Sequence, residues 1–290
     1  MQSKQLKQVV VILGAVALGA LVAWGGSFHG QEVAGVKVFA LAIIGAFVVQ
    51  WILYIPAVLA GTEKFYDLAG GVGFISTTLF GLIATPRVTS LGWLLSFMVF
   101  LWAARLATFL FIRVMKSGAD DRFDDIKGNK IRFLLTWTLQ GLWVAVVASA
   151  AWAATSSSSG VGITWISVLG ALVWLAGMVI ESTADFQKNA FKKNPQNKGK
   201  FIREGIWSRS RHPNYFGEIV LWGGLFIAAA PALVGWQWVT ILSPLLTVVL
   251  LTRVSGIPLL EKKANQRWGG QPDYEEYKKN TPVLIPKVGK

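Results

Sequence analysis

The chain has 290 residues, of which 53% are hydrophobic and 15% are charged, and Lys and Arg outnumber Asp and Glu by 28 to 15. This composition excludes an ordinary soluble domain and is typical of a polytopic membrane protein. The absence of Cys excludes disulfides, thiolate catalysis and Cys-ligated metals, and the two His residues argue against a histidine-rich site, so we expect no metal.

Eight apolar runs, each near the length that crosses a bilayer, follow one another along the chain. They cover roughly residues 9–26, 34–60, 68–85, 91–112, 133–154, 161–181, 216–234 and 236–252. The first run follows Lys4 and Lys7 as a signal peptide would, but no small-residue cleavage site leads into a soluble domain, and we interpret it as a retained helix. Little more than Gly235 separates the last two runs, so one of them can be a half-span or part of a tight hairpin. The sequence therefore predicts an all-α bundle of about seven transmembrane helices, with seven and eight both possible. We expect these helices to form a single membrane domain over residues 1–290.

The third run contains Gly70, Gly71 and Gly73, a weak match to the glycine-rich loop of dinucleotide-binding domains. In a Rossmann domain that loop follows a strand and opens a helix, and no such strand precedes these glycines. We interpret them as small residues where helices pack closely.

Lys and Arg gather in three segments of the chain, at residues 113–132, at 188–211 and from 253 onward. By the positive-inside rule these segments face the cytoplasm. With eight spans both termini are cytoplasmic, and with seven the N-terminus lies on the other side. Anionic lipid headgroups would attract the same charges, so membrane lipids are expected partners. The charges lie on short loops between spans, which argues against nucleic acid.

A polar stretch, G-I-W-S-R-S-R-H-P-N-Y-F-G-E at residues 205–218, lies directly against the seventh apolar run. Arg, His and Glu at the edge of hydrocarbon lose solvation unless they face a wet cavity, pair with one another or bind a ligand. Pro213 is suited to the first turn of a helix. Arg209, Arg211 and His212 then precede a helix N-terminus, whose free N–H groups favour an anion such as a phosphate. The stretch therefore predicts one side of an anion-binding site, with other segments of the chain forming the rest.

This string, together with P-D-Y-E-E-Y-K-K-N-T-P-V-L-I-P at residues 272–286, resembles the membrane-embedded steroid 5α-reductase superfamily, especially its bacterial members. It is more distantly similar to sterol reductases and isoprenylcysteine carboxyl methyltransferases, and the likeness is strongest over residues 165–290. The resemblance implies NADPH-dependent reduction of an enone C=C bond in a steroid or sterol-like lipid. It further implies a bacterial inner-membrane protein whose cofactor site and C-terminus face the cytoplasm, with residues 1–132 as the lipid-substrate half and 133–290 as the NADPH-binding half.

Carried over residue by residue, the resemblance implies that Asn214 and Glu218 contact the cofactor. Asp185 matches the family pattern, whereas Glu181 stands where the family has an amide. Lys192 and Lys200 stand where animal enzymes tend to have phosphate-binding arginines, and lysine lacks the bidentate fork of arginine, so Arg203, Arg209 or Arg211 can take over the phosphate. The expected cofactor contacts are Arg105, Arg113, Asp185, Lys192, Lys200, Arg203, Arg209, Arg211, His212, Asn214, Tyr215, Glu218, Arg253 and Glu261.

Charge counting agrees with a dinucleotide phosphate as ligand. Such a ligand carries three or more negative charges, and residues 185–218 place seven or more Lys and Arg around one helix N-terminus. Because no Rossmann fingerprint is present, we expect the dinucleotide to lie in a cavity between helices.

Reduction of an enone also needs a group that polarises the carbonyl oxygen as enolate charge develops. The segment T-E-K-F-Y-D at residues 62–67 resembles the acid-bearing segment of the bacterial relatives, and a Glu in an apolar cavity has a raised pKa that suits an acid. We expect Glu63 and Tyr66 to be the catalytic pair, and the expected substrate contacts are Tyr54, Asp67 and Trp102. Trp102 stands where alignment on Arg105 places a family tyrosine, and Trp cannot act as an acid.

The sequence is compatible with several alternative roles for these residues and for the protein. Residues 63–67 can be an ordinary interfacial loop, and Arg105 can be paired for structural reasons. The chain can instead be a membrane methyltransferase of the isoprenylcysteine type that uses S-adenosylmethionine, although that cationic cofactor gives no reason for so many cations. It can also be a non-catalytic lipid-binding relative. The sequence does not decide the physiological substrate, or between a monomer and an oligomer.

Overall fold

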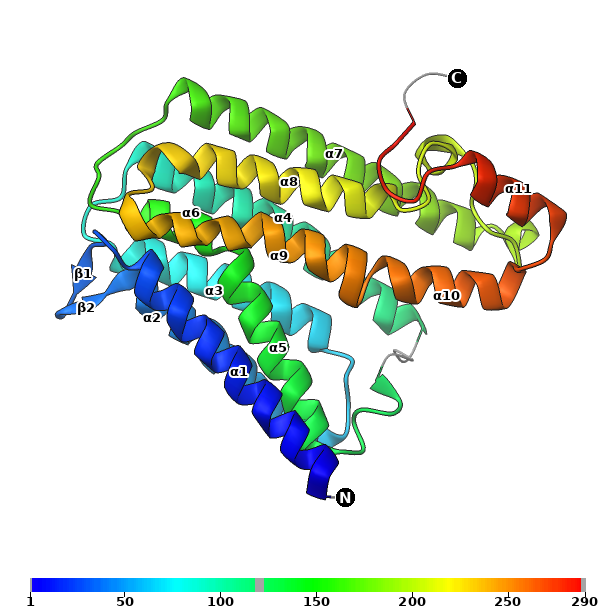
Figure 1. Cartoon of the computed structure of the whole chain (residues 1–290), viewed down its shortest axis with the longest axis horizontal. Coiled ribbons are helices and arrows are strands. Elements are labelled where there is room, and N and C mark those ends of the chain that lie inside the picture. Colours follow the sequence, from blue (N-terminus) through cyan, green and yellow to red (C-terminus); the bar gives the residue numbers. More distant parts are fainter. Residues whose placement is uncertain (1, 118–122, 288–290) are drawn as a thin grey trace. The chain divides into compact units, whose positions relative to one another are not determined.

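The computed structural model describes residues 2–117 and 123–287 (Figure 1). The helices are α1 Gln2–Gly26, α2 Val38–Ala60, α3 Tyr66–Ala84, α4 Ser90–Ser117, α5 Lys130–Val147, α6 Ser149–Thr155, α7 Trp165–Lys193, α8 Pro213–Ala229, α9 Leu242–Val249, α10 Ile257–Trp268 and α11 Pro272–Asn280. The two short strands β1 Glu32–Val33 and β2 Val36–Lys37 pair antiparallel as a hairpin. The all-α architecture expected from the sequence is confirmed.

Seven helical segments in the described ranges are long and apolar enough to cross a membrane. They are Lys4–Gly26, Val38–Ala60, Tyr66–Ala84, Ser90–Ile112, Trp165–Lys193, Pro213–Ala232 and Gly235–Trp268. The α5–α6 pair, bent by 49°, would be the eighth if it counts as one span. The expectation of seven or eight spans is confirmed, and the last segment extends well beyond the apolar run seen in the sequence. Between the last two segments the backbone turns at Gly235, whose φ of 53° lies in the left-handed region that favours glycine.

By its internal contacts the chain divides into two compact units. The first unit comprises Met1–Ser167 and Ala228–Ser243, and the second comprises Val168–Ile227 and Pro244–Lys290. The halves expected from the sequence, with their boundary after residue 132, stay a prediction about function.

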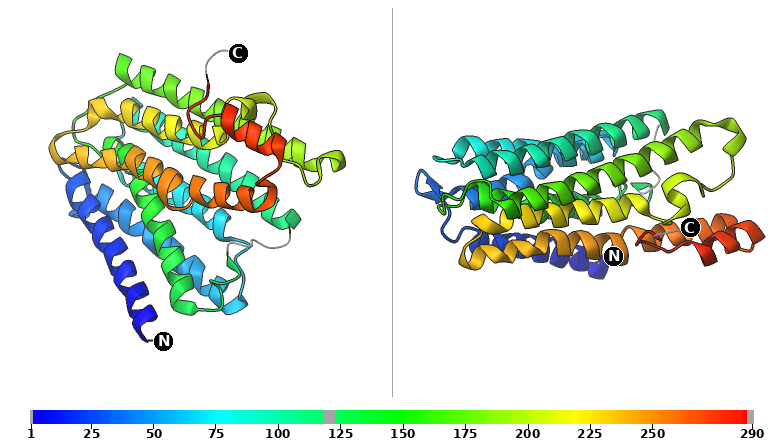
Figure 2. Two further views of the ribbon diagram at one scale, coloured as in Figure 1. Left: turned by 45° about the vertical axis from the view of Figure 1, so that its right-hand side comes forward. Right: turned by 90° about the horizontal axis from the view of Figure 1, so that it is seen from above.

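In the first unit α2 packs against α3 and α5, and α3 packs against α4 (Figure 2). The largest side chains of its core, such as Phe39, Phe74 and Trp102, are at most 1% exposed. Burial of each contributes about 1.5–3 kcal/mol relative to exposure in water. Aliphatic side chains such as Leu59 and Ile83 are instead about four-fifths exposed, at 82% and 77%, which is typical of helix faces that contact lipid acyl chains.

The glycines of α3 allow neighbouring side chains to reach its backbone. A Cβ atom at Gly70 would collide with Nε2 of Gln140, one at Gly71 with Cβ of Ala107, and one at Gly73 would lie 2.6 Å from Nε2 of Gln50. The three glycines lie inside the helix and not in a turn after a strand. The packing interpretation of these glycines is therefore confirmed.

In the second unit α7 and α8 run side by side with their backbones in contact (Figure 2). A Cβ atom at Gly177 of α7 would lie 2.5 Å from the backbone N of Leu221, and one at Gly217 of α8 would lie 2.5 Å from the backbone N of Glu181. Glycine at these positions is therefore what brings the polar start of α8 next to the polar end of α7.

Candidate functional site

The second unit contains a cavity of about 280 Å³, called here the cationic cavity. Its walls come from the last turns of α7, the segment before α8, and helices α10 and α11. The residues that line it are Lys188, Phe191, Lys192, Lys200, Phe201, Ile202, Trp207, Arg211, His212, Leu260, Glu261, Lys263, Ala264, Arg267, Trp268, Tyr274 and Tyr277. Six of these are Lys or Arg, six are aromatic, and Glu261 is the one acid among the described lining residues. Such a lining attracts an anion with an aromatic or apolar part.

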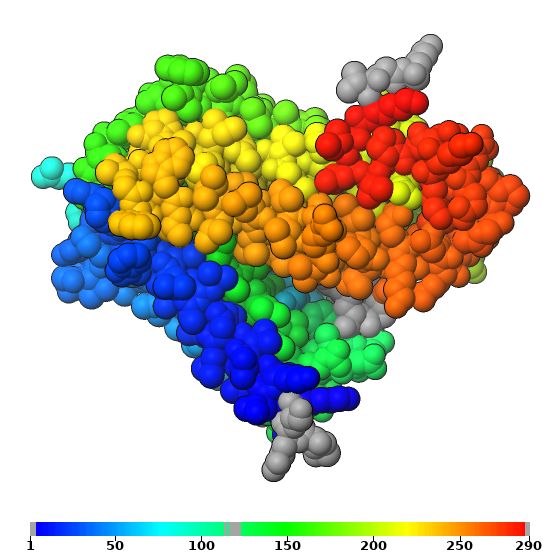
Figure 3. All heavy atoms as spheres, viewed as in Figure 1, coloured from blue at the N-terminus to red at the C-terminus, as the bar shows by residue number. Residues whose placement is uncertain are grey.

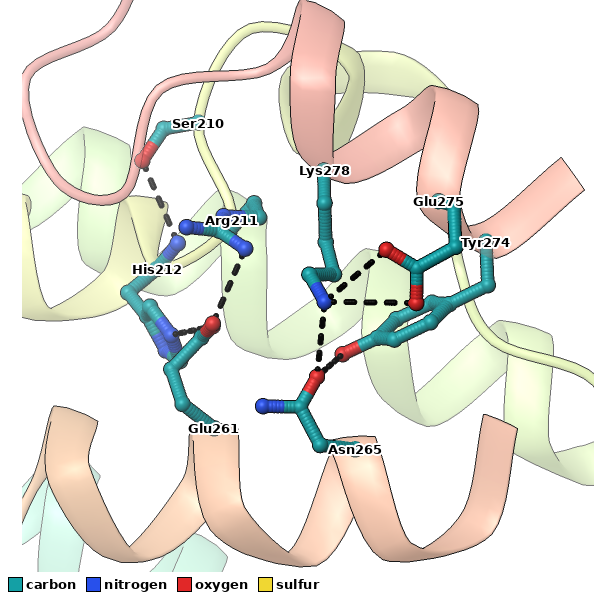
Figure 4. A network of polar contacts seen from close by, with 8 residues as sticks. All are labelled: Ser210, Arg211, His212, Glu261, Asn265, Tyr274, Glu275 and Lys278. Atoms are coloured by element: carbon teal, nitrogen blue, oxygen red, sulfur yellow. Dashed lines mark hydrogen bonds and ion pairs between the residues drawn. The ribbon is translucent and has the colours of Figure 1, made fainter. Parts of the chain in front are cut away.

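An ion-pair network anchors the segment before α8 to α10 (Figure 4). Nη1 of Arg211 lies 2.9 Å from Oε2 of Glu261, and Nε2 of His212 lies 2.8 Å from Oε1 of the same carboxylate. His212 is 5% exposed, and the ring of Tyr215 stacks on it at 5.8 Å between centroids. Because one carboxylate binds both side chains, Glu261 holds them at the cavity wall.

The C-terminal segment holds the same loop from the other side. The hydroxyl of Tyr277 donates to the carbonyl of Trp207 at 2.6 Å, and the backbone N–H groups of Arg211 and Lys287 donate to the carbonyls of Pro282 and Arg209, each at 2.9 Å. In the space-filling view the C-terminal residues, in red, lie against α10 (Figure 3). These bonds give a structural reason for the 272–286 string noted in the sequence.

Helix α11 carries ionisable groups whose environment shifts their pKa values. Burial raises the pKa of Tyr277, and burial likewise raises the pKa of Tyr274. The pKa of Glu275 is lowered, first because the Gly270 N–H donates to its carboxylate and then because Lys278 does. Both phenols are therefore neutral at physiological pH and contribute ring surface and hydroxyl groups to the cavity, not charge.

At the head of α8, three buried polar atoms have no partner among the described residues. They are Nε of Arg211, Nδ1 of His212 and Oδ1 of Asn214. The amide of Asn214 faces the buried Asp185, whose Oδ1 lies 3.5 Å from Nδ2. Buried polar atoms are costly when unpaired. The Nε–H of Arg211 is a donor and fits a phosphate oxygen, whereas Oδ1 of Asn214 is an acceptor and fits an N–H or O–H donor of a polar ligand. A cavity of about 280 Å³ fits a part of such a cofactor, since whole-ligand pockets run to about 300–1,000 Å³.

The structure brings together some of the residues expected to bind the cofactor and separates others. Lys192, Lys200, Arg211, His212 and Glu261 line the cationic cavity. Those that do not line it are Arg105, Asp185, Arg203, Arg209, Asn214, Tyr215, Glu218 and Arg253. Of the candidates for a relocated phosphate contact, only Arg211 reaches the cavity. The side chain of Arg113 lies outside the described part of the structure.

Sequence reasoning did not single out several lining residues. Lys188 lies with its Nζ 4.5 Å from the centroid of the Trp207 ring, and Lys263, Arg267 and Trp268 follow one another on α10. In the sequence the cations of α10 look like any basic segment after a membrane span. The signal in the sequence is the four-residue spacing of Lys263 and Arg267, which puts both on one face of a helix.

The residues expected to act on the substrate lie in the first unit. Glu63, between α2 and α3, is 4% exposed, and Nζ of Lys127 donates to its Oε2 at 3.1 Å. This hydrogen bond raises the pKa of Lys127. The hydroxyls of Tyr66 and Tyr54 donate to the carbonyls of Thr136 and Lys130, each at 3.0 Å. Glu63 is therefore buried beside a cation, and the catalytic role of Glu63 and Tyr66 stays a prediction.

A second cavity, called here the small cavity, lies in the first unit between α3, α4 and α5 and has a volume of about 50 Å³. Its lining residues are Asp67, Gly71, Phe74, Trp102, Ala103, Leu106, Ala107, Leu110, Gln140 and Trp143. Two of the expected substrate contacts, Asp67 and Trp102, lie on this lining. Within residues 2–117 and 123–287, the structure forms no group of three or more His, Asp or Glu that could hold a metal ion.

Comparison with known proteins was consistent with the resemblance seen in the sequence. The family described as "Protein of unknown function (DUF1295)" matches residues 53–281. The chain is 28% identical over 168 residues to 3-oxo-5-alpha-steroid 4-dehydrogenase 1 of Rattus norvegicus, which covers 56% of this chain and 59% of that protein. It is 31% identical over 126 residues to the steroid 5-alpha-reductase DET2 of Arabidopsis thaliana, covering 43% of this chain and 42% of that protein.

A shorter similarity links the chain to a different class of enzyme. It is 36% identical over 66 residues to the probable O-methyltransferase ustE of Ustilaginoidea virens, covering 23% of each protein. The chain spans 59% of the length of the rat relative, 42% of the Arabidopsis relative and 23% of the methyltransferase. No solved structure gives a significant match. Since the family match extends over most of the chain, the protein belongs to the DUF1295 family, which is steroid 5α-reductase-like.

Proposed function

We propose that the protein is an NADPH-dependent membrane reductase that reduces the C=C bond of a 3-oxo-4-ene steroid or a similar hydrophobic enone. The observation that carries this proposal is the cationic cavity, which gathers six Lys and Arg side chains and six aromatic rings at the polar end of apolar helices. The printed names of the rat and Arabidopsis relatives support the reaction class. We further propose that the cavity faces the cytoplasm of a bacterial cell, where NADPH is available.

The second unit would bind the cofactor through the cations of the cavity. Lys192 and Lys200 are exposed and would contact phosphate oxygens, whereas Arg211 is held in place by Glu261 and can offer its remaining N–H groups. Trp268 and Phe201, 5.8 Å apart between centroids, offer flat apolar surfaces to a purine ring. When bound, NADPH would supply a hydride for the β carbon of the enone.

The first unit would act on the lipid. As the C=C bond is reduced, negative charge develops on the carbonyl oxygen and must be stabilised by a hydrogen-bond donor. We propose that Tyr66 donates the hydrogen bond, and that Glu63 passes a proton from the ammonium of Lys127, which donates to its carboxylate, to the developing enolate. The Tyr66 hydroxyl would exchange its bond to the Thr136 carbonyl for one to the substrate oxygen.

The proposal is tested by cofactor binding to the purified full chain in lipid nanodiscs. Lys192 lines the cavity, and its neighbour Lys193, also exposed, does not. We expect Lys192→Ala to raise the Kd for NADPH about tenfold, because a charge-assisted contact contributes about 1.5–3 kcal/mol. Lys193→Ala removes the same charge from the same helix turn and is expected to leave the Kd unchanged. Binding is read from NADPH fluorescence and from the shift in Tm.

The same preparations distinguish the reductase from its main rival. Progesterone as the enone is expected to be consumed with oxidation of an equal amount of NADPH. Stabilisation by S-adenosylmethionine with no response to NADPH would contradict the proposal, and so would equal losses of NADPH affinity in the Lys192 and Lys193 variants.

A further inference from the structure

The small cavity of the first unit is large enough for one polar group of a ligand and too small for a lipid body. Its volume of about 50 Å³ would hold a few water molecules. Most of its wall is apolar, from side chains such as Phe74, Leu106 and Leu110. The side chains on it with acceptor oxygens are Asp67 and Gln140, and no Lys, Arg or His is among its described lining residues. Trp102 and Trp143 on the same lining carry ring N–H donors, so it is the acceptor oxygens that favour a hydrogen-bond donor on an apolar molecule.

The orientation of the Gln140 amide follows from one hydrogen bond. Its Nε2 lies 3.0 Å from the carbonyl oxygen of Tyr66. A carbonyl oxygen can only accept, so the atom beside it must be the amide nitrogen. The second polar atom of the amide is then the oxygen Oε1, which is a hydrogen-bond acceptor. It has no hydrogen-bond partner among the described residues.

This acceptor is buried, because Gln140 is 6% exposed. A buried acceptor without a donor is costly, and such atoms in native proteins usually bind water or a ligand. A ligand hydroxyl would donate to Oε1 and satisfy it, whereas a ketone at the same place would leave it unpaired and add a second unpaired acceptor. A site of this kind discriminates strongly against a ligand that lacks the hydroxyl.

We propose that Gln140 and the small cavity form a subsite for the hydroxyl group of an apolar lipid, so that the protein binds lipid alcohols in preference to the matching ketones. The inference names a ligand class for the proposed reductase, a hydrophobic enone that also carries a hydroxyl. It rests on the proposed function only in treating that ligand as the substrate.

Gln50 of α2 provides a matched control, because it also bonds to the backbone of α3. It is 0% exposed, its Nε2 donates to the carbonyl of Ala69 at 3.0 Å, and its Oε1 also has no partner in the described structure. Both glutamines therefore anchor α3 in the same way, through space left by glycines. Gln50 does not line the small cavity. A variant of Gln50 loses only its hydrogen bond to the backbone of α3. A variant of Gln140 loses the equivalent hydrogen bond and also the acceptor of the proposed subsite.

The test measures equilibrium binding of radiolabelled steroids to the full chain in nanodiscs. Two pairs of probes differ only in hydroxyl or ketone at one carbon: testosterone with androstenedione, and 5α-cholestan-3β-ol with 5α-cholestan-3-one. We expect the parent to bind the alcohol about tenfold more tightly than the ketone in at least one pair. Gln140→Met is expected to abolish this preference by weakening the alcohol alone, and Gln50→Met to preserve it.

Equal affinities for alcohol and ketone in both pairs on the parent protein would overturn the proposal without any variant, and would leave water as the occupant of the cavity. Equal weakening of both ligands by Gln140→Met, or loss of the preference in Gln50→Met, would overturn it as well. Oxidation of NADPH is measured separately. If the protein prefers the alcohol but does not oxidise NADPH, the subsite proposal stands and the proposed reductase function is wrong. If it oxidises NADPH but shows no preference for the alcohol, only the subsite proposal is wrong.

Discussion

At the scale of single residues, charge and burial explain where the candidate site lies. Arg211 and His212 are next to each other in the chain, and Glu261, 49 positions after His212, binds both. A half-buried arginine next to an apolar helix is tolerated when a carboxylate compensates its charge, as Glu261 does for Arg211. Lys192 and Lys200 remain exposed on the same cavity. The residues divide into a pair bound to Glu261, which shapes the wall, and lysines whose side chains are exposed at the cavity.

Glu63 is the residue whose catalytic role can be tested most directly. We expect Glu63→Gln to lower kcat for enone reduction on the order of 100-fold, because the amide cannot supply a proton to the developing enolate. The Kd for NADPH is expected to stay unchanged, since the cationic cavity is formed by other residues. Initial rates with a saturating enone and a parallel NADPH titration measure the two quantities.

Asp124 is the matched control for this variant. Its carboxylate lies 3.5 Å from the same Lys127 ammonium, and its side chain is 63% exposed. Asp124→Asn is expected to keep kcat within about twofold, as an exposed ion pair contributes little. If Glu63→Gln turned over as fast as the parent, or if both variants lost the same activity, Glu63 would have a structural role through Lys127 and not a catalytic one.

At the scale of elements, glycines decide which helices come into backbone contact. In α8 a Cβ atom at Gly224 would lie 2.8 Å from the carbonyl oxygen of Gly170 and would collide with the backbone N of Trp174. Gly217 makes the equivalent contact with α7 two turns earlier along α8. Such close packing is a common source of helix association in membranes, where water does not drive helices together.

Adjacent glycines of α8 allow a controlled test of this contact. Gly224→Ala is expected to destabilise the protein by about 1–3 kcal/mol, because the added methyl group overpacks α7 against α8. At Gly223 a Cβ atom would meet nothing within 4 Å, so Gly223→Ala is expected to be neutral or to stabilise by up to about 1 kcal/mol through helix propensity. Thermal unfolding of both variants in the same detergent measures the difference. A Gly224 variant as stable as the Gly223 variant would show that the helices tolerate separation.

At the scale of the whole molecule, hydrophobic patterning and basic segments are consistent with a polytopic membrane protein. Seven helical segments, or eight with the bent α5–α6 pair, are long and apolar enough to span a membrane in the described ranges. Each of the two compact units contains a cavity of its own, with cations in the second unit and with an amide and a carboxylate in the first. The two lining chemistries are consistent with the proposal that an anionic cofactor and an uncharged lipid bind at separate places.

The positive-inside rule predicts an orientation in the membrane. This orientation can be measured, because the chain has no native Cys. Single Cys variants are placed at Ser158 and at Lys198, both exposed. We expect a membrane-impermeant maleimide added to intact cells to label Ser158→Cys, and to label Lys198→Cys only after permeabilisation. Labelling of both from outside would be incompatible with a cytoplasmic cofactor site.

The sequence alone indicated the helical class, the number of candidate spans and the family. A bilayer requires an apolar run of nearly fixed length for each helix, and these runs are visible without any structure. The string at 205–218 likewise pointed to Arg211, His212 and Asn214 at a helix N-terminus, and α8 does begin at Pro213. The bend between α5 and α6 and the extension of the last span to Trp268 could not be read from hydropathy.

The walls of the cavities were decided only by tertiary structure. Lys263 and Arg267 reach the cationic cavity because α10 is joined to the segment before α8 through Glu261, and local periodicity carries no information about such a contact. Gln140 lines the small cavity because Gly70 leaves room for its amide. Sequence determined which segments are apolar and which residue types can do chemistry, since both follow from local composition. Packing decided which of those residues share a cavity, since that depends on side chains far apart in the chain.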